Sequence, residues 1–260
     1  LIGTLNTVIF CPEDLQLIKG TPSGRRRFLD MEISQTSATY YHQLMQYNRL
    51  LQQRNAILKE YRGKQNIPLE EWDLQLADMA SFIVKKRLES LKKINLLIDL
   101  MNRKLTGGLE NLTIGYEQPY MDNGSLEFTK EGFYERIKAA LPQDRHRMTT
   151  SVGPHRDDLR FFSDEMDLKK FGSQGQQRTA VLSLKLSELE FIKSEVGEYP
   201  VLLLDDVLSE LDESRRANLL QFIHKRIQTF ITTTDIHDFK DLKSVQFISC
   251  EGGKVQYGQP

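Results

Sequence analysis

The sequence VLLLDDVLSELD occupies residues 201–212 and predicts both a fold and a site. Its first four residues form a continuous apolar run, which is typical of a strand in a parallel sheet that is covered on both faces. The strand would deliver Asp205 and Asp206 to its carboxyl end, where open α/β sheets bind their ligands. We therefore predict an α/β fold with a parallel sheet and a binding site at the carboxyl end of this strand.

Two acids in this position have the layout of a Walker B element. Mg²⁺ prefers hard oxygen ligands, so Asp205 would help to hold the ion, and Asp206 stands where a general base or water-positioning residue would be. An Asp side chain is shorter than the Glu that is usual in this class of ATPase, which favours slow hydrolysis. The alternative is a buried strand that ends in two solvated acids. The pattern SELD that follows favours the Walker B interpretation, with Ser209 and Asp212 in a D-loop.

A Gly-rich turn, GSQG at 172–175, directly precedes a predicted helix at 176–195, and the stretch GSQGQQ at 172–177 includes the first two residues of that helix. Backbone N–H groups at a helix start can hold an anion, but a phosphate loop needs the spacing G-x-x-x-x-G-K-[ST], and no such run occurs in the 260 residues. The stretch is a variant of the LSGGQ loop of ABC-type ATPases, which contacts the γ-phosphate of ATP held on the facing subunit and so needs no lysine. The alternative is a Gly-rich helix cap. The predicted nucleotide-binding residues, acting in trans, are Ser173, Gln174, Gly175, Gln176 and Gln177.

A third element, FITTTD at 230–235, follows one helix after the Walker B strand, where the switch residue of ABC-type ATPases belongs. That residue is usually a histidine. Here Thr234 or Asp235 occupies the position, and His237 lies just beyond it. This departure leaves the sensing of the γ-phosphate open.

The apolar pattern between residues 36 and 105 is helical. A heptad-like stripe runs through a helix predicted at 36–62, where Arg54 interrupts it, and another runs through a helix predicted at 69–105. A short break separates the two, so we predict an antiparallel helical hairpin that Gly107 and Gly108 end. The predicted division of the chain is an N-terminal piece of an ATPase lobe at 1–31, an inserted helical arm at 32–106 and the C-terminal part of the ATPase head at 107–260.

Turn residues and the period of the apolar residues predict the remaining elements. These are strands at 4–10, 112–114, 126–128, 159–162, 229–233, 245–249 and 254–257, a loop at 20–24, a helix at 130–141 stopped by Pro142, a strand end at 149–152 and a helix at 212–226.

The composition is that of an ordinary globular chain. The formal net charge is -1, so any surface for nucleic acid would be a local patch. Cys11 and Cys250 share no metal-type spacing, which favours structural thiols in a reducing cytosol. No apolar run reaches the roughly 18 residues that span a bilayer. The start, Leu1-Ile2-Gly3, is not a signal peptide, and we expect a chain cut in mid-domain.

The three nucleotide-binding elements, together with GPHRDDL at 153–159 and PEDLQLIKGTPSGRRRFLD at 12–30, resemble the RecF family. This is a family of bacterial DNA recombination and repair proteins with an ABC/SMC-type ATPase head. The resemblance covers essentially the whole chain, and the order of the motifs makes it specific. The family's Walker A loop lies in an N-terminal part that would precede Leu1, so we expect a C-terminal fragment with a partial head and an inserted helical arm.

The resemblance implies that the full protein binds ATP with Mg²⁺ and forms a homodimer around two sandwiched nucleotides. It also implies binding of DNA and, with RecR, the loading of RecA where single-stranded gaps meet duplex, in the cytoplasm at the nucleoid. The full-length protein would be a weak ATPase. We expect the fragment alone neither to hydrolyse ATP nor to retain it.

Two other classes of function stay open. The chain could be an SMC-like structural or adaptor head whose main work is to bind RecR, although the short arm argues against a chromosome-spanning tether. A metal nuclease that uses Asp205 and Asp206 is disfavoured, because adjacent residues on a strand point to opposite faces and no further acids cluster with them in the sequence.

Two charged clusters each allow two interpretations. Arg25, Arg26 and Arg27 could follow DNA phosphates, or could form a solvated helix start that pairs with nearby acids. His155 and Arg156, with the two acids after them, could contact DNA or a partner, or could form a self-paired turn that fixes two strands.

Overall fold

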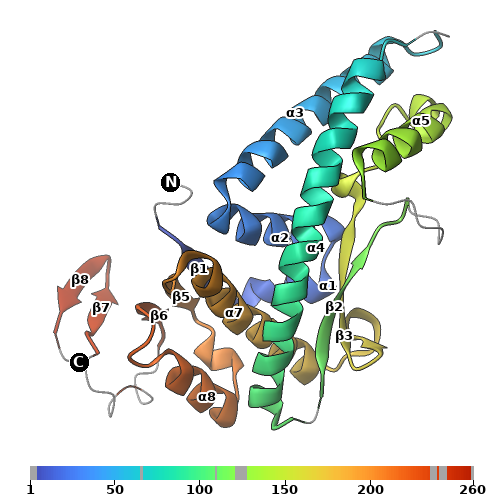
Figure 1. Ribbon diagram of the computed structural model, residues 1–260. Coiled ribbons are helices and arrows are strands. Elements are labelled where there is room, and N and C mark those ends of the chain that lie inside the picture. The colour runs from blue at the N-terminus through green and yellow to red at the C-terminus, as the bar shows by residue number, and fades with distance from the viewer. Residues whose placement is uncertain are drawn as a thin grey trace.

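The elements of the computed structural model gather around a long helical hairpin and a small parallel sheet (Figure 1). The structure describes residues 5–64, 67–108, 110–120, 128–234, 239 and 245–258. Among these residues the strands form one parallel sheet, one antiparallel sheet and one separate hairpin. The α/β fold class and its parallel sheet are thereby confirmed.

The Walker B strand lies at the centre of the parallel sheet. This strand, β5 (Val201–Asp205), pairs with β1 (Thr7–Phe10) on one side and with β6 (Thr229–Thr232) on the other. Asp205 lies opposite Thr232 in the register. One face of the sheet is buried in the main core and carries Val8, Phe10, Leu202 and Leu204.

The opposite face of this sheet is open to solvent. Ile9 is 51% exposed and Phe230 is 53% exposed. The register aligns both of them with Leu203, so the three side chains form one apolar row across the sheet. Because parallel sheets are normally covered on both faces, this row is a packing surface that the described residues leave uncovered.

The helix after the Gly-rich stretch is buried almost all round. This helix, α7 (Gln174–Val196), packs against β1 and against the long helix α4 (Glu70–Thr106). The prediction that this helix is buried on more than one side is confirmed. It ends at Gly197, whose φ of 94° is in the left-handed region that favours glycine.

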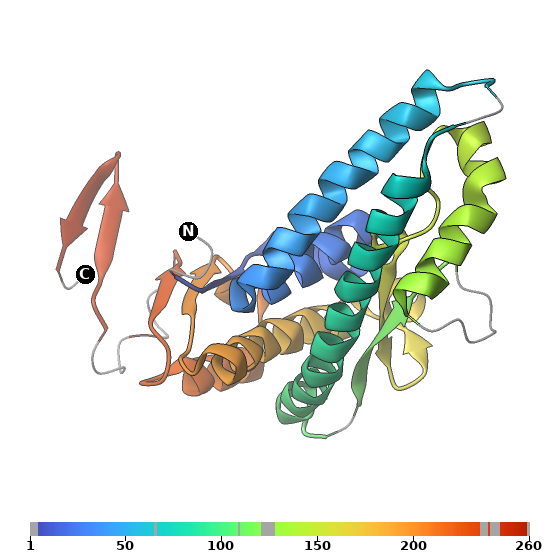
Figure 2. The same ribbon diagram turned by 45° about the horizontal axis from the view of Figure 1, so that its top comes forward.

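The predicted helical hairpin is present. The helix α3 (Ala38–Glu60) and α4 lie side by side and run antiparallel in both views (Figures 1 and 2). The cap of α3 is Ser37, whose side chain accepts a hydrogen bond from the Tyr40 N–H at 3.2 Å. As predicted, α4 ends at Gly107, whose φ is 70°.

The arm helices share one core with the head, because α4 also packs against α7 and against α5 (Lys130–Arg147). The predicted boundary after residue 31 falls within α2 (Pro22–Thr36), and the boundary after residue 106 coincides with the end of α4. The three-part division of the chain stays a prediction.

Three of the predicted local elements are wrong. Residues 22–24 are helical, because Pro22 occupies the first turn of α2. The helix α5 continues past Pro142 to Arg147, since buried Asp144 in its last turn is held by Arg54 at 2.7 Å. Residues 149–152 form no strand, because side chains bind their backbone: Thr150 N–H donates to Asn55 and Ser151 N–H donates to Asp144.

The antiparallel sheet lies beside α4 and consists of β2 (Leu112–Glu117), β3 (Asp158–Ser163) and β4 (Met166–Asp167). The hairpin of β7 (Ile248–Glu251) and β8 (Lys254–Tyr257) stands apart at the left of both views (Figures 1 and 2).

None of the described helices is both long and apolar enough to cross a membrane. The predicted strand at 126–128 begins outside the described residues. The short helices are η1 (Pro12–Leu15), α1 (Gln16–Lys19), η2 (Pro154–Arg156), α6 (Leu168–Phe171), η3 (Leu208–Glu210) and α8 (Glu213–Ile223).

Candidate functional site

The two candidate acids lie where the sequence predicted them. Asp205 is the last residue of β5, Asp206 follows it, and both are exposed at the carboxyl edge of the parallel sheet. Among the described residues, no hydrogen bond or ion pair connects them to the Gly-rich loop at 172–177. The structure therefore presents the acids and the loop as two separate sets of groups.

A residue that the sequence did not single out joins the two acids. Thr232, at the end of β6, donates its hydroxyl to Asp205 Oδ1 at 2.7 Å. The hydroxyl oxygen of Thr232 also accepts a hydrogen bond from the Asp206 N–H at 3.0 Å. The sequence placed the switch position two residues later, at Thr234, which is exposed. The other predicted switch residue, Asp235, and the nearby His237 lie outside the described residues.

Asp206 has an unusual backbone. Its φ is 52°, in the left-handed region that non-glycine residues rarely adopt. Its carbonyl accepts the hydroxyl of Ser209 at 2.8 Å, so the backbone of Asp206 is bound on both sides. The strand alternation that disfavoured a nuclease ends at Asp205, because Asp206 is outside β5. Among the described residues, no group of three or more acids, histidines and cysteines is arranged to hold a metal ion.

The predicted signature loop is the start of α7. Ser173 is its cap: the Ser173 hydroxyl accepts the Gln176 backbone N–H at 3.2 Å, and the side-chain oxygen Oε1 of Gln176 accepts the Ser173 N–H at 3.0 Å. Ser173, Gln174 and Gly175 are exposed. Gln177 is buried and donates to the Leu168 carbonyl at 2.7 Å.

The five loop residues therefore divide into two groups. Gln176 also donates to Glu110 at 3.0 Å, so Gln176 and Gln177 anchor the loop. The exposed residues 173–175 carry a hydroxyl, an amide and the free N–H groups of a helix start, which are suited to a phosphate. The helix-cap interpretation and the signature-loop interpretation are both compatible with this geometry.

The predicted D-loop residues have local roles as well. Asp212 caps α8 by accepting the Arg215 N–H at 2.9 Å, and this hydrogen bond is the main reason that the pKa of Asp212 is lowered. Ser209 binds the Asp206 carbonyl, as described above. Both side chains are exposed.

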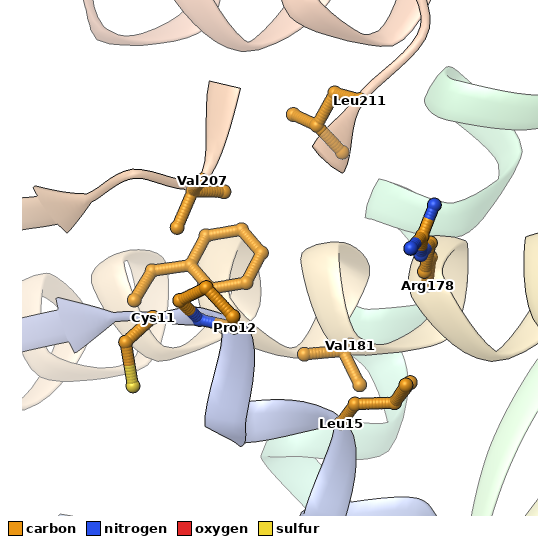
Figure 3. Close-up of a pocket in the computed structure, with 8 residues that line it drawn as sticks. Cys11, Pro12, Leu15, Arg178, Val181, Val207 and Leu211 are labelled. Atoms are coloured by element: carbon orange, nitrogen blue, oxygen red, sulfur yellow. The ribbon is translucent and has the colours of Figure 1, made fainter. Parts of the chain in front are cut away.

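A small apolar cleft lies beside the acids, between the end of β1, the first turns of α7 and the segment after β5 (Figure 3). Val207 and Leu211 face it from one side, and Val181 of α7 faces it from the other. Val207 and Leu211 are at most 6% exposed. The predicted D-loop segment and the helix that carries the predicted signature loop therefore line the same cleft.

The oxygen groups at the sheet edge fit part of a Mg²⁺ site. A protein usually holds this ion through one or two carboxylates, with phosphate oxygens and water completing the octahedron. Asp205 supplies one exposed carboxylate, and its hydrogen bond to the Thr232 hydroxyl fixes its orientation. The remaining ligands would come from a nucleotide and from water.

The arginine cluster does not act as one unit. Arg25 is 3% exposed and forms two hydrogen bonds with Asp158, at 2.7 and 2.8 Å. Arg26 is half-buried and donates to the Asp157 carbonyl at 2.7 Å. Arg27 is exposed. Any contact of this cluster with DNA would therefore depend on Arg27 and on the free part of Arg26.

The turn that contains His155 and Arg156 is bound internally. Tyr47 Oη and His155 Nδ1 are 2.6 Å apart, and Nε2 of the ring lies 3.0 Å from the Thr150 carbonyl. Burial lowers the pKa of His155 to about 4, which keeps the ring neutral at pH 7. Arg156 donates to the same carbonyl at 2.7 Å. These contacts fit the self-paired turn better than an exposed contact surface.

A larger cleft, of about 460 Å³, lies between α2 and α3 and is bordered by the turn at 154–155. Arg26, Arg27, Tyr41 and Asn48 contribute polar groups to its lining. Asp30 also lines it, but both of its oxygens are engaged by Arg87 at 2.9 Å. The cleft is thus rich in hydrogen-bond donors.

The chain was compared with known proteins. It is 50% identical over 245 residues to the DNA replication and repair protein RecF of Alkaliphilus oremlandii, an alignment that covers 94% of this chain and 67% of that protein. It is 45% identical over 261 residues to RecF of Halalkalibacterium halodurans, covering 98% of this chain and 70% of that protein. No protein-family model matches the chain.

The fold of the chain is also similar to that of solved structures. The structure of the recombination mediator protein RecF with ATP in the RecFOR pathway superposes with a TM-score of 0.88 at 36% identity, over 99% of this chain and 69% of that one. The Smc head domain of Pyrococcus furiosus, bound to the C-terminal domain of ScpA, matches with a TM-score of 0.50 at 14% identity, over 97% of this chain and 61% of that one. The second match concerns the fold alone.

Proposed function

Because the chain belongs to the RecF family of DNA replication and repair proteins, we propose that it is part of an ATP-switched DNA-binding subunit. In this proposal two copies associate around ATP, and the signature loop of one copy covers the nucleotide that the other copy holds. The observation that carries it is the division of the loop: Gln176 and Gln177 fix it from behind, while residues 173–175 stay exposed at the start of a long helix.

Asp205 and Asp206 would act on the nucleotide that a copy holds itself. Asp205 would bind Mg²⁺, and Asp206 would position or deprotonate the attacking water. When bound, Mg²⁺ would neutralise charge on the phosphates. Asp206 is exposed and its backbone is held by Thr232 and Ser209, so its side chain starts from a defined position.

The phosphate loop of this site would lie on a segment other than these 260 residues, which contain no G-x-x-x-x-G-K-[ST] run. The uncovered apolar row of Ile9, Leu203 and Phe230 is a surface on which such a segment would pack. For the 260-residue chain alone we therefore propose no ATP hydrolysis and little ATP binding. Turnover by the purified chain at the rate of a full-length protein would contradict this.

The trans role of the loop is tested by Ser173→Arg in a full-length protein that carries this segment. The longer, charged side chain should block ATP-dependent dimerisation, measured by analytical ultracentrifugation, and leave ATP binding by each copy intact. Ser194→Arg is the matched control, because Ser194 is exposed near the other end of α7. A Ser173→Arg protein that still dimerises with ATP would exclude the trans role.

For the DNA contact we propose the cleft between α2 and α3. Arg27 is exposed there and Arg26 is half-buried, and phosphate contacts of this kind supply most non-specific affinity. Arg27→Gln should weaken binding to duplex DNA and lower the salt dependence of binding by about one phosphate contact. Arg62→Gln, at an exposed arginine just after α3, is the control. Equal DNA affinity of the two variants would remove Arg27 from the interface.

One similar solved structure is that of RecF with ATP in the RecFOR pathway, which supports RecR as the partner that we propose for this chain. An adaptor head that mainly holds RecR is the second candidate. The two are separated by a RecR binding measurement on the 260-residue chain without nucleotide, for example by calorimetry. Full affinity of this chain without nucleotide would favour the adaptor. No binding by this chain, together with binding by a full-length protein only when ATP is present, favours the ATP-switched subunit.

A further inference from the structure

We infer that Thr232 is the positioning residue of the Walker B acids: its hydroxyl aligns the Asp205 carboxylate and holds the Asp206 backbone in place. The expected effect on ATP hydrolysis rests on the proposed function, whereas the contacts of Thr232 do not depend on it. The switch position that the sequence suggested is Thr234 or Asp235, whereas the hydroxyl that contacts the acids belongs to Thr232.

The direction of the two hydrogen bonds is fixed by chemistry. A threonine hydroxyl has one proton to donate and lone pairs to accept with. The Asp206 N–H can only donate, so Thr232 Oγ1 accepts it at 3.0 Å. The hydroxyl proton is then left for Asp205 Oδ1 at 2.7 Å, and an ionised carboxylate can only accept. One hydroxyl therefore binds both acids without conflict.

The position of the hydroxyl is set by the sheet. Thr232 lies opposite Asp205 in the parallel register of β5 and β6. A β-branched side chain on a strand has restricted rotation about χ1, and the two hydrogen bonds restrict it further. The carboxylate of Asp205 is thus held by a group with little freedom of its own.

The backbone of Asp206 needs such support. Its φ of 52° is a conformation that costs roughly 1–2 kcal/mol for an L-residue and persists only where the surroundings impose it. Thr232 binds its N–H, and Ser209 donates to its carbonyl at 2.8 Å. The two hydroxyls fix the peptide groups on either side of Asp206 and so set the direction of its side chain. Residues that orient metal ligands in this way change metal affinity or activity about 10- to 100-fold when they are lost.

The first test measures the contact itself on the 260-residue chain. Thr232→Val keeps the shape of the side chain and removes the hydroxyl, Thr232→Ser keeps the hydroxyl, and Thr229→Val removes a hydroxyl from the other end of the same strand. Amide hydrogen exchange, followed by NMR, should become about tenfold faster at Asp206 in Thr232→Val only. Unchanged exchange at Asp206 would overturn the inference, whatever the ATPase activity is.

The second test measures the consequence in a full-length protein that carries this segment. Thr232→Val should lower kcat about 10- to 100-fold and raise the Mn²⁺ concentration needed for tight nucleotide binding, monitored by EPR. Nucleotide affinity in EDTA and the melting temperature should match those of Thr229→Val. Thr232→Ser should restore kcat to within about threefold of wild type. A serine variant as impaired as the valine variant would assign the effect to the methyl group and overturn the inference.

The two tests separate this inference from the proposed function. A wild-type full-length protein without Mg²⁺-dependent ATP hydrolysis would refute the proposed ATPase. Amide hydrogen exchange at Asp206 would still show whether Thr232 holds the Asp206 backbone. Normal hydrolysis by wild type and by Thr232→Val alike would refute the positioning role and leave the proposed ATPase standing.

Discussion

Arg25 on α2 and Asp158 at the start of β3 form a bidentate ion pair across 133 residues of sequence, with N–O distances of 2.7 and 2.8 Å. The pair connects the arginine cluster to the GPHRDDL stretch, two motifs that carry the family resemblance. Arg25 also donates to the Gly20 carbonyl at 2.9 Å. The Arg25 guanidinium is therefore engaged by groups within the chain, which gives this residue a structural role.

Arg25→Met should therefore destabilise the fold. It leaves the Asp158 carboxylate, which is 20% exposed, without its partner, and we expect a loss of about 2 kcal/mol in the free energy of unfolding. Urea denaturation followed by circular dichroism measures this. Arg27→Met, at the exposed member of the same cluster, should change stability by less than about 0.5 kcal/mol. Equal effects of the two variants would contradict the assignment.

A second buried arginine, Arg54 on α3, connects the arm to α5. It donates to Asp73 at 2.6 Å and to Asp144 at 2.7 Å, and its own side chain is fully buried. Arg54→Met should lower the free energy of unfolding by about 4 kcal/mol, because it leaves buried carboxylates without a counter-charge. The control is Arg49→Met, at an exposed position of the same helix. A loss below about 1 kcal/mol would mean that the acids are protonated or solvated when Arg54 is absent.

Arg54 also illustrates how far the sequence could predict the fold. The heptad stripe predicted α3 and α4, because helix periodicity is local and repeats in the sequence. In the stripe itself Arg54 was only an interruption. Its burial depends on Asp73 and Asp144, which lie 19 and 90 residues away, and no local pattern encodes such a partnership.

In the candidate site, too, the local elements could be predicted from the sequence and the contacts between distant residues could not. The strand and its two acids were predictable from one apolar run, and the start of α7 was predictable from a Gly-rich turn before a helix. Thr232 was not, because its relation to Asp205 exists only through the register of β5 and β6. Pro142 was misread for a related reason: the local helix-breaking signal was outweighed by the burial of Asp144 one half-turn later.

Gly153 is a position where only glycine fits. Its φ is 132°, and a Cβ built there would lie 2.3 Å from the Tyr47 hydroxyl. Gly153→Ala should lower the free energy of unfolding by at least about 2 kcal/mol, because it combines backbone strain with displacement of Tyr47 from His155. Gly24→Ala is the control: Gly24 is inside α2 with open space around its Cβ direction, so alanine should stabilise it by about 0.5–1 kcal/mol. Thermal or urea unfolding of both variants measures the contrast.

His155 should make stability depend on pH. Burial, together with the nearby positive charges of Arg156, Arg26 and Arg87, lowers its pKa from 6.5 to about 4, although the hydrogen bond to the Thr150 carbonyl acts in the opposite direction. The unfolded chain then binds a proton at a higher pH than the folded chain does. This contribution to stability is complete above pH 6.5 and is lost as the pH falls from 6.5 to about 4, by at most about 3 kcal/mol.

The measurement is the free energy of unfolding of wild type minus that of His155→Gln, taken at intervals from pH 7.5 to pH 4. The difference should fall with decreasing pH, because glutamine does not titrate and keeps only part of the bonding to Tyr47 and Thr150. His42→Gln, at an exposed histidine of α3, controls for the removal of a histidine as such. NMR gives an independent reading, since the His155 ring signals should stay at their neutral positions down to about pH 5. Two outcomes would contradict this assignment: titration of those signals near pH 6.5, or a stability difference that does not change with pH. Either would show that His155 is solvated and is not held in a buried contact with Tyr47.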